Sequence, residues 1–322
     1  MKRTALLATI AGVGLAVGLV AWLGAGKIWH ALLAVGWGGF ALIVGWQFLV
    51  FVVLATAWRL LCPGGRWHVL VWGRLVREGG TNILPFSEAG GIAFGASAVA
   101  LGGVRLPRAI ASSLADVAAE FIGEIPFILF GLLILLSRDP KGSALWPVLA
   151  GVGLVLAGGV ALIWAERHSA RLFHAIGRRI AARWAWRAQK EADAVQHEFE
   201  LVFSAPRRIG AAAGLHFLGW LGGGATVWLC YWLLGGKIGL LSCMAIEALL
   251  SAALAVAFLV PAGLGVQEVS YVVIGQLFGM PAHLSIGVSL LRRARDIVIG
   301  APALASWQLA ETRRLRSEPR RA

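Results

Sequence analysis

The segment "SSLADVAAEFIGEIPF" places three carboxylates, Asp116, Glu120 and Glu124, inside an otherwise apolar stretch. Their spacing of four residues puts them on one face of a helix. A charge at the centre of a lipid bilayer costs about 2.5–3.5 kcal/mol, so such residues face protein and pair with opposite charges. The three acids are therefore candidates for ion pairing, for contact with a polar ligand or for carrying protons.

A second apolar stretch, "SLLRRARDIVIG", carries Arg292, Arg295 and Asp296, with Arg292 and Asp296 on one helix face. A helix rises about 1.5 Å per residue, which places Glu124 and Arg295 each roughly 25 Å from the cytoplasmic ends of their helices. We therefore expect a contact network among Glu120, Glu124, Arg292 and Arg295. The network could line a transport path, or it could only hold helices together.

Two more carboxylates, Glu88 and Glu268, stand beside prolines and glycines in the segments "NILPFSEAGG" and "FLVPAGLGVQEVS". Irregular backbone that faces lipid leaves polar groups unsatisfied, so such breaks lie where protein or a wet cavity surrounds them. Helix N-termini at a break offer N–H groups and partial positive charge to an anionic headgroup. The alternative is that the glycines only allow close helix packing.

Charged residues also flank both breaks. Arg74 and Glu78 form an i,i+4 pair before the first break, and Arg77 faces either the cavity or the cytoplasmic interface. Glu247 is the positional counterpart before the second break. The residues that we expect to line a cavity for a polar headgroup are Arg74, Arg77, Asn82, Pro85, Glu88, Asp116, Glu120, Glu124, Glu247, Pro261, Gly263, Gly265, Gln267, Glu268, Arg292, Arg295 and Asp296.

The composition indicates that these charges lie in a membrane protein. Of 322 residues, 59% are hydrophobic and 14% charged, and continuous apolar runs exceed the roughly 20 residues that cross a bilayer. The net charge of +13 falls between the runs, which favours membrane orientation and anionic lipids over nucleic acid as its cause. The three cysteines are scattered and the seven histidines dispersed, so we expect no disulfide, metal site, cofactor or histidine–carboxylate cluster.

Basic residues predict the topology, because cytoplasmic loops are enriched in lysine and arginine. Lys2 and Arg3, nine basic residues in 166–208 and five arginines in the tail place both termini in the cytoplasm. The connection at 27–37 then lies outside. About six full crossings satisfy these constraints, at about 4–26, 38–61, 108–137, 144–165, 207–235 and 284–311.

Two apolar segments remain, and each is interrupted near its middle. We predict re-entrant helical hairpins at 66–102 and 238–281, within repeats at 38–137 and 207–311. The first and last prolines of the two repeats, Pro85 and Pro126 against Pro261 and Pro302, are separated by 41 residues in both. Such an inverted repeat with broken helices is a plan of transporters that bind substrate near the midplane.

The predicted fold is thus a single all-α polytopic membrane domain over 1–322. It contains about six full transmembrane helices and two re-entrant hairpins in an inverted repeat. Its remaining parts are a cytoplasmic basic amphipathic segment at 166–206 and a basic tail at 312–322.

Several stretches together resemble a known family: "REGGTNILPFSEAGG", "AIASSLADVAAEF", "AFLVPAGLGVQE" and "VSLLRRARDIVIGAPAL". Over about residues 40–312 the sequence is similar to the lysylphosphatidylglycerol synthase transmembrane-domain superfamily, and most similar to the hopanoid-biosynthesis-associated HpnL membrane proteins. The resemblance implies a flippase-like fold in the bacterial inner membrane. The bifunctional synthases append a soluble catalytic domain after this region, and we expect no aminoacyl transfer from this chain.

The leading hypothesis is a lipid transporter that acts on a phospholipid or a hopanoid and is not an enzyme. The sequence contains no GxxxxGK[ST] motif, so energy would come from a gradient or a partner. The alternatives are an intramembrane lipid-modifying enzyme and a membrane scaffold for hopanoid-biosynthesis enzymes. Membrane lipids, and hopanoid-biosynthesis proteins, are the expected partners.

Overall fold

The computed structural model describes residues 25–83, 87–138, 153, 185–256 and 265–317, and all regular structure within these ranges is helical. This confirms the predicted all-α class for the described part of the chain. The predicted crossings at 4–26 and 144–165, and most of the segment 166–206, lie outside the described residues. The described helices are α2 (Ala25–Leu61), α3 (Trp67–Ile83), α4 (Ser87–Leu101), α5 (Leu106–Arg138), α7 (Ala185–Phe203), α8 (Pro206–Leu233), α9 (Leu240–Val256), α10 (Val266–Leu277) and α11 (Ala282–Ser317).

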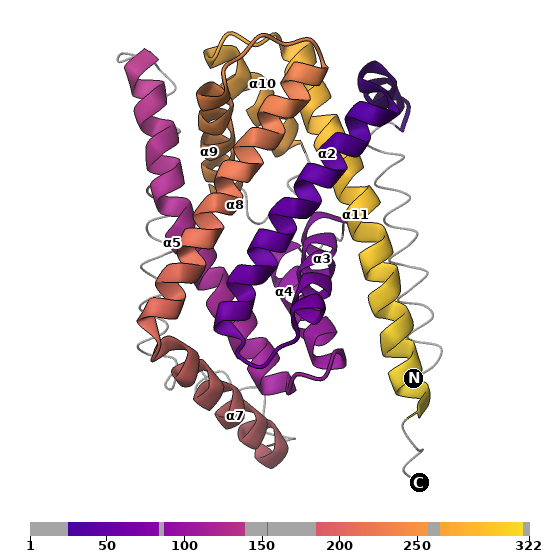
Figure 1. Cartoon of the computed structure of the whole chain (residues 1–322), viewed down its shortest axis with the longest axis vertical. Helices are drawn as coiled ribbons and strands as arrows, with labels where there is room; N and C mark the ends of the chain where they lie inside the picture. Colours follow the sequence, from indigo (N-terminus) through magenta and orange to yellow (C-terminus); the bar gives the residue numbers. More distant parts are fainter. Residues whose placement is uncertain (1–24, 84–86, 139–152, 154–184, 257–264, 318–322) are drawn as a thin grey trace.

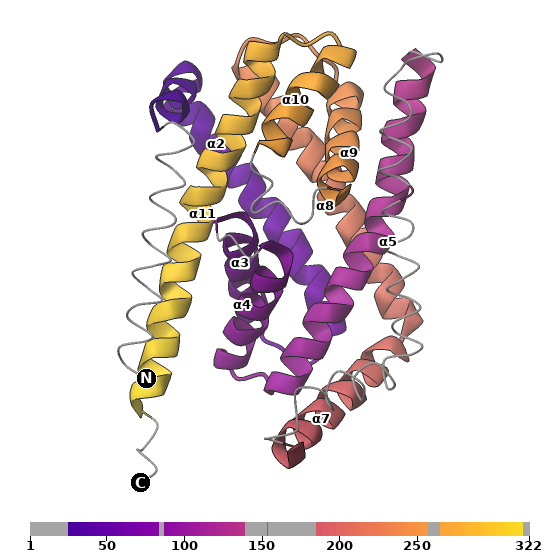
Figure 2. The ribbon, with the colours of Figure 1, turned by 180° about the vertical axis from the view of Figure 1, so that it is seen from behind.

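Four long helices, α2, α5, α8 and α11, run along the molecule, and the short helices fill the space beside them (Figure 1). α2 and α11 run from the upper end of the view to the lower end, while α5 and α8 run upward. α3 and α4 lie in the lower half and α9 and α10 in the upper half. Seen from behind in Figure 2, the two short pairs again occupy opposite halves, with α7 across the lower end.

The two segments predicted as hairpins each contain a pair of short helices. α3 and α4 fall within 66–102 and pack against each other, and α9 and α10 do the same within 238–281. The predicted breaks around Pro85 and Pro261 involve residues 84–86 and 257–264, which lie outside the described residues. Pro126 and Pro302 lie inside α5 and α11, as the sequence predicts.

The predicted connection at 27–37 is helical and lies within α2. Two helices meet in this stretch at Gly36, which departs from helical geometry at φ 69° and ψ 164°. The stretch contains no proline, and its apolar residues have adequate helix propensity. A left-handed glycine alone therefore produces a kink where a loop was expected.

By length and composition, two described helices could cross a membrane, Ile28–Leu61 and Leu106–Arg138. Buried helices of soluble proteins can meet the same criterion, so it supports the membrane assignment only weakly.

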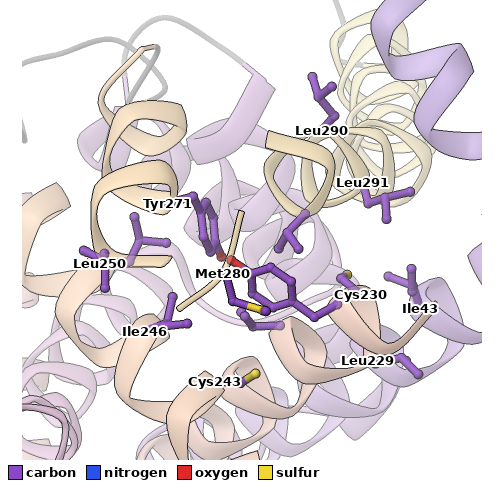
Figure 3. Packing of buried hydrophobic residues seen from close by; sticks show 14 of the residues in the cluster. Ile43, Leu229, Cys230, Cys243, Ile246, Leu250, Tyr271, Met280, Leu290 and Leu291 are labelled. Atoms are coloured by element: carbon purple, nitrogen blue, oxygen red, sulfur yellow. The ribbon is translucent and has the colours of Figure 1, made fainter. Parts of the chain in front are cut away.

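The largest buried cluster of hydrophobic side chains lies where α2, α8, α9, α10 and α11 meet. Figure 3 shows Tyr271 and Met280 at its centre, with Ile246 and Cys230 close to them. Ile43 of α2 and Leu291 of α11 pack at its border, and both are fully buried. This core fixes the second helix pair against the long helices.

Glycines let helices approach closely in the lower half. Gly79 of α3 faces Gly300 of α11, and a Cβ built on Gly79 would lie 2.8 Å from the Gly300 carbonyl oxygen. Gly80 faces Gly91 across the α3–α4 pair, where a Cβ on Gly80 would lie 2.9 Å from the Gly91 Cα. At these positions the glycines therefore allow close helix packing.

Candidate functional site: two buried charge clusters

The first charge cluster joins α3 to α5. The Arg77 Nη1 donates to Asp116 Oδ2 at 2.8 Å, and its Nη2 donates to Glu120 Oε2 at 2.6 Å. Arg74 contacts the same two carboxylates, each at 3.2 Å. Both guanidinium groups and Asp116 are buried. Each charge thus has an opposite partner, as burial requires.

Asp116 also binds a histidine. Its Oδ1 lies 2.9 Å from His216 Nε2 of α8, and both side chains are almost completely buried. The expectation of no histidine–carboxylate cluster in the apolar segments is therefore wrong. The two residues are 100 positions apart in the sequence, so no local motif predicts the pair.

The third carboxylate of the first cluster is Glu78. Arg74 Nη2 lies 2.6 Å from Glu78 Oε1, which confirms the predicted i,i+4 pair. Asn82 Nδ2 donates to the Glu78 carbonyl at 3.0 Å. The Glu78 and Glu120 side chains remain 18% and 21% exposed, whereas those of Arg74 and Arg77 are 2% and 4% exposed. The acidic edge of this cluster is thus the accessible one.

The second charge cluster joins α9 and α10 to α11. Glu247 of α9 accepts hydrogen bonds from Tyr271 Oη at 3.0 Å and from Arg292 Nη1, and Arg292 also contacts the Tyr271 hydroxyl. Arg293 forms an ion pair with Glu268 of α10. Partial exposure persists here too, at 17% for the Arg292 side chain and 23% for Glu268.

Glu268 has a second role at the start of α10. Its Oε2 accepts the Gly265 N–H at 2.9 Å, so it satisfies a backbone donor at the helix N-terminus. Gly265 has φ 78°, a conformation that favours glycine. The neighbouring Gln267 Nε2 donates to Ser289 of α11 at 3.0 Å.

Arg295 and Asp296 extend the second cluster towards α2. Arg295 Nη2 lies 2.6 Å from Asp296 Oδ1, and Arg295 Nη1 donates to Gln47 Oε1 of α2 at 2.8 Å. Gln47 also accepts from Thr226 Oγ1 of α8 at 3.4 Å.

Of the predicted network among Glu120, Glu124, Arg292 and Arg295, the residues Glu120, Arg292 and Arg295 have other partners. Glu120 pairs with α3, while Arg292 and Arg295 find partners on α9 and α2 and within α11. The reason is that α5 and α11 do not pack along each other, because the short helices lie between them and supply nearer partners. Glu124 is buried on α5.

The remaining predicted site residues contribute no described side chain. Pro85, Pro261 and Gly263 lie outside the described residues, and so does the side chain of Glu88 at the start of α4.

The two clusters are neighbours along α8. His216 belongs to the first, and a Cβ built on Gly223 would lie 3.3 Å from Glu247 Oε1 of the second. Seven residues of helix correspond to about 10 Å. Sequence reasoning missed Gln47, His216 and Tyr271 as members, although each is a polar residue within an apolar run.

These features define the class of protein: over its described residues it is all-helical, and its long helices pack with two pairs of short helices and with paired, buried charges. Residues 9–303 match the model of the family described as "Lysylphosphatidylglycerol synthase TM region". The chain belongs to this family and is a membrane protein of the lysylphosphatidylglycerol synthase-like, flippase type. No curated protein and no solved structure matched in the corresponding comparisons.

Proposed function

We propose that this protein moves a lipid between the leaflets of the membrane, with the headgroup passing between the two broken helix pairs while the acyl or polycyclic part stays in lipid. The observation that carries the proposal is the pair of charge clusters. Each joins short helices beside a break to a long helix, and each combines buried ion pairs with partly exposed charges.

The packing of the helices supports an inverted repeat made of α2–α5 and α8–α11. α3 packs on α11, the last helix of the other half, and α9 correspondingly packs on α5. Pro261 lies 176 positions after Pro85, and Pro302 lies 176 positions after Pro126, so one sequence offset relates the prolines of the two halves. The same offset relates Asp116 to Arg292, so the central residues of the two clusters occupy equivalent positions. Transporters with such repeats bind substrate near the midplane.

The charges suggest how a headgroup could pass. A polar headgroup that reaches Glu120 or Arg292 can replace part of an existing ion pair, so no charge is left without a partner during passage. The apolar long helices face lipid, where exposed residues such as Leu33 and Leu133 match acyl chains. The protein then acts by binding and releasing the headgroup, without chemistry on the lipid.

The cargo, the location and the partners that we propose rest on the resemblance to the HpnL proteins. We propose a hopanoid or a related lipid as cargo, the bacterial inner membrane as the location, cytoplasmic termini, and hopanoid-biosynthesis proteins as functional partners. Energy would come from a gradient or a coupled partner.

A flipping assay in proteoliposomes tests the proposal. Fluorescent lipid in the inner leaflet is protected from a membrane-impermeant quencher until it flips, and the purified protein should accelerate its exposure. Arg292→Gln should slow exposure at least about tenfold, since it removes the partner of a buried carboxylate, a loss worth more than about 1.4 kcal/mol. The matched control is Arg314→Gln, which removes a surface ion pair with Glu311.

Equal flipping with and without protein would contradict the transport proposal. Equal rates for a hopanoid-derived probe and a phospholipid probe would contradict only the choice of cargo.

A further inference from the structure

One buried carboxylate ties α7, the helix across the lower end of the molecule, to the start of α5 (Figure 2). Glu198 of α7 is only 5% exposed. Its Oε2 accepts from Arg108 Nε at 2.9 Å, and its Oε1 accepts from Arg105 Nη1 at 3.3 Å. Arg105 lies in the turn between α4 and α5, and Arg108 lies in the first turn of α5. Glu198 therefore holds the point where the chain leaves the α3–α4 pair.

The turn that Glu198 holds is packed onto the lower end of the α3–α4 pair. A Cβ built on Gly102 would lie 2.2 Å from Val69 Cγ1 of α3, so the turn has no free space on this side. The Gly102 N–H donates to the Ala98 carbonyl of α4 at 3.0 Å. A displacement of the α3–α4 pair at this end therefore pulls on the contacts of Glu198.

The two arginines differ in how firmly they are held. Arg108 donates to Glu198 from two nitrogens, and its side chain is 36% exposed. The Arg105 side chain is 70% exposed, and Glu198 is its only side-chain partner among the described residues. The adjacent Leu106 is 50% exposed. An exposed arginine next to an exposed leucine suits a membrane surface, where the guanidinium lies among headgroups and the apolar side chain among acyl chains.

We propose that α7 is a strap that restrains the α3–α4 pair, and that an anionic lipid headgroup loosens the strap by competing with Glu198 for Arg105. Headgroup phosphate oxygens accept from the same guanidinium donors as a carboxylate does. Glu198 keeps Arg108 as its partner when Arg105 turns away, so the release leaves no buried charge unpaired.

Apolar contacts keep α7 in place while its ion pair loosens. Val202 and Phe203, at the end of α7, pack against the buried cluster formed by α2, α5 and α8. The inference rests on the proposed function for its purpose: an anionic headgroup that arrives at this surface would free the helix pair that it has to pass.

Hydrogen exchange of the turn tests the strap. The full-length protein is placed in nanodiscs of phosphatidylcholine, and mass spectrometry follows peptides covering 99–109, which include the amides that bond the turn to α4. We expect Glu198→Gln to speed this exchange at least about tenfold, because both arginines lose their charged partner. The matched control is Glu200→Gln on the same helix, whose carboxylate accepts only from Gln196, at 3.0 Å. Exchange as slow in Glu198→Gln as in the control would overturn the strap.

A second comparison tests the lipid and uses a variant at an exposed position. In nanodiscs that contain phosphatidylglycerol, exchange of the same peptides in wild type should be about two- to fivefold faster, the effect of losing one exposed ion pair. Arg105→Gln should exchange at this faster rate already in phosphatidylcholine and should not respond to phosphatidylglycerol. No response in wild type, or an equal response in Arg105→Gln, would overturn the role of the lipid. The same acceleration by inorganic phosphate, added to phosphatidylcholine nanodiscs, would overturn the assignment to a lipid headgroup.

Neither comparison measures lipid movement, so the two proposals fail separately. The expected exchange rates without flipping in proteoliposomes would overturn only the transport proposal. Flipping by a protein whose exchange does not depend on Glu198 would overturn only the strap.

Discussion

Asp116 is the side chain on which the first cluster depends, because Arg74, Arg77 and His216 all contact its carboxylate. Removing it would take one carboxylate partner from both buried guanidinium groups and from the buried His216. Breaking a buried ion pair from one side is much more damaging than losing the pair as a whole, since the remaining charge stays desolvated.

We therefore expect Asp116→Ala to lower the free energy of unfolding by about 3–5 kcal/mol. Denaturant-induced loss of helical circular dichroism in detergent measures the change. Glu311→Ala is the control, because its partner Arg314 has a side chain 53% exposed and such surface pairs contribute about 0–1 kcal/mol. Similar losses of unfolding free energy in the two variants would show that Asp116 stabilises the protein no more than a surface residue does.

The sequence predicts the members of the clusters better than their partners. Burial of charges in apolar runs identifies Asp116, Glu120, Glu247 and Arg292 directly, since each needs a partner inside the protein. The choice of partner depends on which helices lie side by side. The predicted depths of Glu124 and Arg295 in the membrane were compatible with a contact between them. Depth alone cannot predict that other helices lie between α5 and α11.

At the scale of helices, the close packing of α3 against α4 depends on glycines. A Cβ built on Gly91 would lie 2.1 Å from Thr81 Oγ1 and 2.7 Å from the Arg77 carbonyl oxygen. The threonine hydroxyl can rotate away, but the backbone carbonyl belongs to the helix that also carries the clustered arginines. Any displacement of α3 from α4 therefore moves the charge cluster as well.

Gly91→Ala should lower the free energy of unfolding by about 1–3 kcal/mol, the usual range for overpacking. Gly45→Ala in α2 is the matched control, because nothing lies within 4 Å of its added Cβ. Alanine is the better helix former by about 1 kcal/mol, so this control should be neutral or more stable. The same denaturation measurement applies, and a Gly91 variant as stable as its control would refute the tight approach.

The helix pairs could be predicted because Pro85 and Pro261 stand together with glycines in otherwise apolar segments, a combination that disfavours one continuous helix. The kink in α2 could not be predicted, because a single glycine such as Gly36 is compatible with both helical and positive-φ backbone. Glycine is common in membrane helices, so its presence alone does not separate a loop from a kink.

For the whole molecule, the two charge clusters have opposite patterns. In the first, arginines of a short helix meet acids of a long one. In the second, acids of short helices meet arginines of a long one, with Asp116 and Arg292 at positions 176 residues apart. A headgroup between the halves would therefore find an acidic edge on one side and a mixed edge containing Arg292 on the other.

The proposed inverted topology makes an accessibility prediction for the whole chain. The α2–α3 and α8–α9 connections lie at opposite ends of the molecule (Figure 1), and each contains an exposed basic residue, Arg66 and Lys237. A cysteine at position 66 should react with an impermeant maleimide only after the cells are permeabilised, together with one at Arg316 in the last turn of α11. A cysteine at Lys237 should react in intact spheroplasts.

The native Cys62, Cys230 and Cys243 are free but buried, so the background labelling should be low, and the parent protein is the control. Reaction of positions 66 and 237 from the same side would contradict hairpins that enter from opposite faces, because both connections would then lie on one surface of the membrane.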